Sequence, residues 1–210
     1  MQSHRYMAFT GSPHALKFAV RDLETVGKAM ALTPGRTVAI QAGGCLGVYP
    51  AYLSKYFASV ITFEGLKTNY RKMRENITAP NVEMHFAALG SQVGTVGLRQ
   101  ERRTKLSSPA HEGIAHVSGS GRTPVVRLDE FDFPVCDLLV LDVEGYELEA
   151  LKGATELLAR CRPVLMVEVN ENCRHYGLVE ADVRAWIADH GYRLLFRKHS
   201  DDVYVPKEWQ

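Results

Sequence analysis

The sequence carries almost no net charge and no long apolar run, and each absence argues against a class of binding partner. Its 210 residues include 25 basic and 24 acidic side chains, which leave a net charge of +1. That balance gives no general electrostatic case for binding nucleic acid or a membrane surface. The longest apolar runs have the length of a strand, far short of a membrane-spanning helix. We therefore expect a protein that binds neither nucleic acid nor membrane.

The sequence also shows no C-x-x-C pair and no visible pattern of a secretory signal. The chain contains four cysteines, Cys45, Cys136, Cys161 and Cys173, and none of them forms a C-x-x-C pair. Zinc and dithiol sites are therefore not indicated. The first residues, MQSHRYMAF, lack the apolar segment of a secretory signal. Scattered thiols without a signal are typical of a reducing compartment, so we expect a cytoplasmic protein.

Strand patterns and helix patterns alternate along most of the chain. Short apolar runs predict strands at 37–42, 59–63, 82–86, 137–141 and 163–167. Apolar residues at helical spacing predict helices at 16–30, 48–57, 70–77, 148–158 and 180–190. Residues 192–197 and 203–205 predict a final antiparallel pair. The alternation predicts an α/β fold with a largely parallel sheet and helices on both faces.

Residues 98–123 interrupt this alternation. They are rich in charge, serine and glycine, and Arg99, Arg102, Arg103 and Lys105 lie close together. Long loops are usually either functional or disordered. We interpret this one as a solvated, flexible loop, and a lid or a contact for an acidic substrate is the alternative. Residues 1–210 are then a single domain, with residues 1–36 as an N-terminal helical segment.

The stretch VAIQAGGCLGVYP combines a predicted strand with residues 43–47, which we call the glycine loop. Glycines after a strand let backbone N–H groups approach a ligand closely. Glu64 follows about 20 residues later, at the end of the next strand, where an acid can accept both hydroxyls of a ribose. The G-x-G-x-x-G fingerprint of NAD sites is absent, because Cys45 stands in the place of the middle glycine. S-adenosylmethionine, which has no phosphate, fits better, and a tight turn without a ligand is the alternative.

Two further stretches place carboxylates at the ends of predicted strands. DLLVLDVEGYELEALKGA carries Asp142 and Glu144 to the end of a buried strand, and RPVLMVEVNE carries Glu168 and Asn170. Carboxylates so close together need a cation, hydrogen bonds or a raised pKa. We interpret them as an acceptor site that holds a substrate hydroxyl or, with hard oxygen ligands, Mg²⁺. Loop capping is the alternative for Glu168 and Asn170, and Glu147 fits best as a complement to a helix N-terminus.

The order of these motifs resembles the FkbM-type methyltransferases, a branch of the class I S-adenosylmethionine-dependent enzymes. The resemblance runs over residues 37–171 and is most specific in LDVEGYELEALKGA after VRLDEF, together with FE at residues 63–64 and AALG at residues 87–90. The family's loop usually reads acid-x-G-A-N-x-G. Gly43 and Gly47 agree with it, whereas Gln41, Gly44 and Cys45 replace the acid, the alanine and the asparagine. The resemblance implies a Rossmann-like class I methyltransferase fold.

The resemblance also implies a division of roles. The glycine loop and the residue near its start should run along the methionine moiety and ribose of S-adenosylmethionine. These residues are Gln41, Gly43, Gly44, Cys45 and Gly47. Glu64 should bind the ribose, and residues 86–88, Ala88 among them, should border the adenine. The catalytic candidates are Asp142, Glu144 and Glu168, and Asp142 should also border the cofactor.

The family implies O-methylation of a small acceptor that carries a hydroxyl, such as a sugar. In the reaction, a carboxylate base or a cation would activate that hydroxyl. Two alternatives remain from the residues alone. One is a cofactor-binding module without catalysis, and the other is an NAD-type oxidoreductase.

Overall fold

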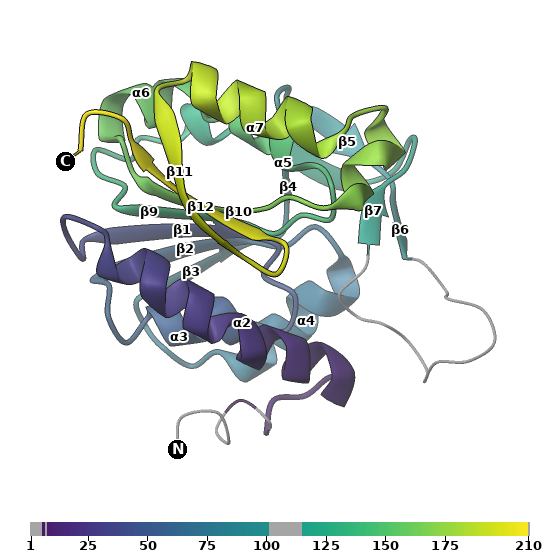
Figure 1. Ribbon diagram of the computed structural model, residues 1–210. Helices are drawn as coiled ribbons and strands as arrows, with labels where there is room; N and C mark the ends of the chain where they lie inside the picture. The colour runs from purple at the N-terminus through teal and green to yellow at the C-terminus, as the bar shows by residue number, and fades with distance from the viewer. Residues whose placement is uncertain (1–5, 7, 101–114, 210) are drawn as a thin grey trace.

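A seven-stranded sheet forms the centre of the computed structural model, which describes residues 6, 8–100 and 115–209 (Figure 1). The strand order is β11-β12-β10-β9-β1-β2-β3. Their bounds are β1 Val38–Ala42, β2 Ser59–Phe63, β3 Val82–His85, β9 Leu138–Leu141, β10 Val164–Glu168, β11 Tyr192–Lys198 and β12 Asp201–Pro206. Strands β3, β2, β1, β9 and β10 are parallel, and β12 pairs antiparallel with both β10 and β11. The predicted fold class is confirmed, including the C-terminal antiparallel pair.

Helices cover both faces of this sheet, as Figure 1 shows. One face carries α2 Pro13–Ala31, α3 Val48–Leu53 and α4 Lys67–Asn76, and the other carries α5 Glu147–Lys152, α6 Thr155–Cys161 and α7 Glu180–Asp189. Neighbouring residues of a strand point to opposite faces. Ala39 accordingly packs in the core under α2 and α3, while Ile40 packs in the core under α5 to α7. The buried strands thus supply two cores, one on each side.

One predicted helix is two helices in the structure. The apolar spacing over residues 148–158 predicts a single element, but α5 ends before Gly153 and α6 begins at Thr155. Two contacts impose the break. A Cβ at residue 153 would lie 2.0 Å from the backbone oxygen of Gly90. The carboxylate of Asp129 accepts a hydrogen bond from the backbone N–H of Leu157 at 3.0 Å, within the first turn of α6. Long-range contacts therefore override a continuous helical pattern.

The segment predicted as a loop has ordered flanks. Strands β6 Leu98–Gln100 and β7 Ala115–Val117 pair antiparallel, and β8 Thr123–Val126 lies between β4 Ala88–Leu89 and β5 Gly94–Val96 in a three-stranded sheet. Two 3₁₀ turns, η1 Leu128–Glu130 and η2 Glu171–Tyr176, complete the elements. Residues 101–114, with Arg102, Arg103 and Lys105, lie outside the described residues. The flanking strands correct the predicted loop at both of its ends.

The strand order reverses on either side of β1, since β2 and β3 lie on one side of it and β9 and β10 on the other. In open α/β sheets, ligands bind beyond the carboxyl ends of the strands at such a switch point. The fold therefore predicts a ligand site among the segments that follow β1, β2, β9 and β10.

In the part of the chain that the structure describes, no helix combines the length and apolarity needed to span a membrane.

Candidate functional site

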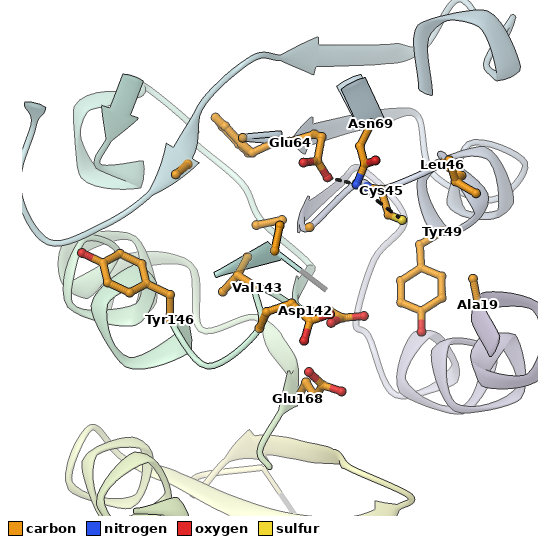
Figure 2. Close-up of a pocket in the computed structure, with 18 of the residues that line it drawn as sticks. Ala19, Cys45, Leu46, Tyr49, Glu64, Asn69, Asp142, Val143, Tyr146 and Glu168 are labelled. Carbon is orange, nitrogen blue, oxygen red and sulfur yellow. Dashed lines mark hydrogen bonds between the residues drawn. The ribbon is translucent and has the colours of Figure 1, made fainter. Parts of the chain in front are cut away.

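A cavity of about 370 Å³ opens at this edge of the sheet (Figure 2). Its walls come from the glycine loop after β1, the ends of β2, β9 and β10, the start of α3, one face of α2, and the strands β4, β6 and β7. Of the residues predicted for the site, the cavity brings together Gly43, Gly44, Cys45, Glu64, Ala88, Asp142, Glu144 and Glu168. Gln41 and Gly47 do not line it.

The glycine loop packs too tightly against its neighbours for side chains at its glycines. Gly43 has a φ of +83°, and a Cβ there would lie 1.7 Å from the backbone oxygen of Asp142. The N–H groups of Gly43 and Gly44 both donate to the backbone oxygen of Phe63 at 3.0 Å, which ties the loop to the end of β2. Gly47 has a φ of +89° and caps α3. The glycines thus hold the loop against β2 and β9.

Cys45 occupies an unusual conformation in this loop. Its φ is +46°, in the left-handed region that residues other than glycine seldom adopt. Its N–H donates to Oε2 of Glu64 at 2.6 Å, and its Sγ accepts from Nδ2 of Asn69 at 3.9 Å. Burial, together with the negative charges of Glu64 and Asp142, raises the pKa of the Cys45 thiol well above its usual value. The thiol is therefore kept protonated, and it is a structural group rather than a nucleophile.

Glu64 lies beside the glycine loop with only 7% of its surface exposed. Besides Cys45, the N–H of Leu66 donates to its carboxylate, at Oε1 and 2.7 Å. Burial raises the pKa of this carboxyl from 4.5 to about 7, although the two N–H groups favour the charged form. Each carboxylate oxygen has a second lone pair. Glu64 can therefore accept two further hydrogen bonds from a ligand in the cavity.

Gln41 is turned into the protein interior, away from the cavity. Its side chain is fully buried, Oε1 accepts from Oγ1 of Thr62 at 2.6 Å, and Nε2 donates to the backbone oxygen of Ala42 at 2.9 Å. Thr62 is its register partner on β2, so the pairing of the two strands sets this contact. We therefore leave Gln41 out of the cofactor site, together with Gly47.

Three predicted carboxylates face the same cavity. Asp142 follows β9, Glu168 ends β10, and in Figure 2 the carboxylate of Glu168 points toward Asp142. Burial and the negative charges of Glu168 and Glu144 raise the pKa of Asp142 well above its usual value. Burial also raises the pKa of Glu168, although Ser200 donates a hydrogen bond to its Oε1 at 3.1 Å, which lowers this pKa. The two groups repel each other when both are charged, so they are suited to share a proton.

Glu144 is held by a tight turn between β9 and α5. Its φ is +56°, and its Oε2 accepts from Nδ2 of Asn172 at 2.7 Å. Glu147, 2% exposed, supports the turn because its Oε1 accepts from the N–H groups of Val143 at 2.9 Å and Gly145 at 3.1 Å. Burial raises the pKa of Glu147 to about 8. Glu147 thus stabilises the backbone that presents Glu144 to the cavity.

The alternative of a magnesium ion in the acceptor site finds no support. Among the described residues, no group of three or more histidine, cysteine, aspartate or glutamate side chains is arranged to hold a metal ion. Asn170, a predicted partner of Glu168, instead accepts the N–H of Asn172 at 2.8 Å and caps η2. This is the loop-capping role that was the alternative for this residue.

Several residues of the cavity were not predicted. The helix α2 contributes Phe18, Arg21 and Asp22, α3 contributes Tyr49, and the turn before α5 contributes Tyr146. Tyr49 has a local signal, because it lies in the first helical turn after the glycine loop. The residues of α2 have none, since their contact with the cavity depends on how the helix packs across the sheet. Of the residues expected to border the adenine, Ala87 and Ala88 line the cavity, as does Leu89, and Phe86 does not.

The comparison with protein families agrees with this geometry. The methyltransferase FkbM domain matches residues 43–194. That range begins at the glycine loop and includes every cavity carboxylate except Asp22. No curated protein sequence matches the chain.

Solved structures share the fold at low sequence identity. A methyltransferase FkbM from Methylobacillus flagellatus KT superposes with a TM-score of 0.54 at 14% identity, over 97% of this chain and 57% of that one, so the chain spans little more than half of its length. A magnesium protoporphyrin IX methyltransferase from Synechocystis PCC 6803 with bound S-adenosylmethionine gives 0.53 at 14% identity, over 98% and 91%. A Streptococcus mutans protein in complex with S-adenosylhomocysteine gives 0.51 at 12%, over 88% and 96%. Because the family model matches well over half of the residues, the chain belongs to the FkbM family of methyltransferases, and these solved structures share its class I fold.

Proposed function

We propose that this chain transfers a methyl group from S-adenosylmethionine to a hydroxyl of a small acceptor, such as a sugar. The observation that carries the proposal is the position of Glu64. Its buried carboxylate lies against the glycine loop at the switch point of the sheet, where two acceptor positions remain for the hydroxyls of a ribose. The family assignment supports the same activity.

The cavity residues fit the parts of this cofactor in order. The apolar wall of Phe63, Ala87 and Leu89 suits an adenine ring, Glu64 suits the ribose, and the close-packed loop from Gly43 leads toward Asp142. When bound, S-adenosylmethionine supplies a methyl group on a sulfonium, whose C–S bond breaks as the bond to the acceptor oxygen forms. The protein then has to align the acceptor and exclude water.

The carboxylates at the strand ends are proposed to take the proton that the acceptor hydroxyl loses. Asp142, Glu144 and Glu168 line one side of the cavity. Burial raises the pKa of Asp142 and of Glu168, so each is a stronger base, once ionised, than an exposed carboxylate. The hydroxyl proton passes to a carboxylate oxygen, the oxygen gains the methyl group, and the sulfur keeps the electron pair of the broken bond.

Calorimetry and a product assay test the proposal. We expect S-adenosylmethionine and S-adenosylhomocysteine to bind and NAD not to bind. We also expect a mass increase of one methyl group in at least one hydroxylated small molecule of an acceptor screen. Cofactor binding without transfer to any acceptor would favour a binding module, and tighter binding of NAD would favour an oxidoreductase.

We extend the proposal to the partners and the cellular compartment of the protein. A small-molecule acceptor calls for no nucleic-acid or membrane partner. The four cysteines form no disulfide in the structure, which supports the cytoplasmic location expected from the sequence.

A further inference from the structure

One end of the cavity is rich in acidic groups. Asp22 from α2, Tyr49 from α3, Asp142 after β9 and Glu168 at the end of β10 line it together, and we call these four residues the acidic recess. A fourth acid, Asp201, lies behind the recess. It is 6% exposed and is the register partner of Glu168 on β12. Four elements far apart in sequence thus bring their acidic or hydroxyl groups to one place.

The hydroxyl of Tyr49 reaches into this recess. The residue is 7% exposed, and its oxygen has no hydrogen bond within the described part of the chain. Figure 2 shows its ring between Ala19 and the carboxylates. Burial and the negative charges of Asp142, Asp201 and Asp22 raise the pKa of Tyr49 well above its usual value. Oε2 of Glu168 is buried in the same recess and has no hydrogen-bond partner among the described residues. A buried polar atom without a partner is costly, and a ligand in the cavity that donates to it would remove that cost.

The recess contains more negative than positive charge. Arg21 is the one arginine or lysine among the described residues that line the cavity, and it binds Asp22 through two hydrogen bonds of 2.7 and 2.8 Å. Asp142 and Glu168 form no ion pair with any cation in the ranges that the structure describes. Adjacent carboxylates favour the binding of an opposite charge, because a cation relieves their repulsion.

We propose that the acidic recess binds a primary ammonium group. An ammonium has three N–H donors. Asp142 and Glu168 supply two charge-assisted acceptors, and the oxygen of Tyr49 supplies the third. The proposal rests on the proposed function, because the ammonium would belong to one of the two substrates of the methyl transfer. One source is the α-amino group of the cofactor's methionine moiety, and the other is an amino group on the acceptor. Because a carboxylate bound to an ammonium is a weak base, this assignment leaves Glu144 to accept the hydroxyl proton.

The cofactor is the first source to test. Calorimetry compares S-adenosylhomocysteine with an analogue in which hydrogen replaces the α-amino group, on the wild type and on Glu168→Gln and Tyr49→Phe. If the recess holds this ammonium, the wild type prefers the natural compound by about 10- to 100-fold. Glu168→Gln then loses most of that preference and Tyr49→Phe loses part of it. Glu156→Gln is the matched control, since Glu156 is exposed on α6, and it keeps the full preference.

The acceptor is the second source. Glucosamine and glucose, which differ in one amino group, are compared as ligands with and without S-adenosylhomocysteine. The ammonium belongs to the acceptor if the wild type prefers glucosamine and Glu168→Gln does not. In that case the wild type should also bind S-adenosylhomocysteine and its analogue without the α-amino group equally well. Because this comparison also runs without the nucleoside, it tests the recess even if no cofactor binds and the proposed function fails. Thermal melts verify that each variant folds. Equal binding within both pairs by the folded wild type would overturn the proposal.

Discussion

Exchanging Glu64 for glutamine tests what burial does to this carboxylate. Burial raises its pKa from 4.5 to about 7, so between these pH values the folded protein holds a proton that the unfolded chain has released. The free energy of unfolding therefore falls as pH rises through this range. At about 1.36 kcal/mol per pKa unit, the contribution of Glu64 falls by about 3 kcal/mol between pH 4.5 and pH 8.

Glutamine keeps the size of the side chain and removes the titration. Its amide oxygen can replace one carboxylate oxygen, but its NH₂ group cannot accept the other N–H bond now made by Cys45 or Leu66. One buried donor then loses its partner, at a cost of about 1–3 kcal/mol. We expect the variant to be less stable than the wild type at pH 5. By pH 8 this difference should shrink by about 2.5 kcal/mol, and it can change sign.

Urea unfolding at pH 5, 6, 7 and 8 measures this difference, with linear extrapolation to water. Glu156→Gln again serves as the control, because its side chain is exposed. Other buried carboxyls, such as Glu147 with a pKa of about 8, titrate in both proteins and cancel in the difference. A stability difference that stays constant from pH 5 to pH 8 would refute the raised pKa of Glu64.

The same variant tests the binding role of Glu64. If its carboxylate accepts the ribose hydroxyls, Glu64→Gln should bind S-adenosylmethionine about 10- to 150-fold more weakly at pH 8. The affinity of the wild type should rise as pH increases through 7, because the charged carboxylate is the better acceptor. Calorimetry on the folded variant decides this point, and unchanged affinity would remove Glu64 from the cofactor site.

Three further predictions concern the acceptor site, the glycine loop and the C-terminal strands. Glu144→Gln removes the carboxylate that is left to accept the hydroxyl proton, so it should slow single-turnover methyl transfer by ~10²–10⁴-fold with little change in cofactor affinity. A parallel loss of cofactor affinity in this variant would instead assign Glu144 to the cofactor pocket. Gly43→Ala should lower the melting temperature strongly, because its Cβ would overlap the oxygen of Asp142, whereas a Cβ at Gly94 meets nothing within 4 Å. Equal melting temperatures for Gly43→Ala and Gly94→Ala would contradict the close packing of the loop. Asp202 is fully buried between Arg184 and Arg197, whose side chains are partly exposed and can be hydrated once the partner is removed, so Asp202→Ala should cost about 1–3 kcal/mol in urea unfolding. A cost below 1 kcal/mol would show that this network is dispensable.

Local patterns in the sequence determined the fold class and indicated several residues of the candidate site. Apolar runs of strand length and helical spacing record which faces are buried, so the alternation of elements could be predicted without the structure. Glu64 and Asp142 could be placed by the same reasoning, because each follows a buried strand and the carboxyl ends of parallel strands meet at one edge. The structure places both in the cavity.

Only the tertiary structure decided which neighbouring groups complete the site. Gln41 looks equivalent to the other strand-end residues, but its pairing with Thr62 across β1 and β2 turns its side chain into the interior. Asp22 and Tyr49 join Asp142 because α2 and α3 pack over one face of the sheet. These contacts join residues distant in the chain, and their formation depends on register and packing angles that no local periodicity records. The acidic recess is therefore a property of the folded chain.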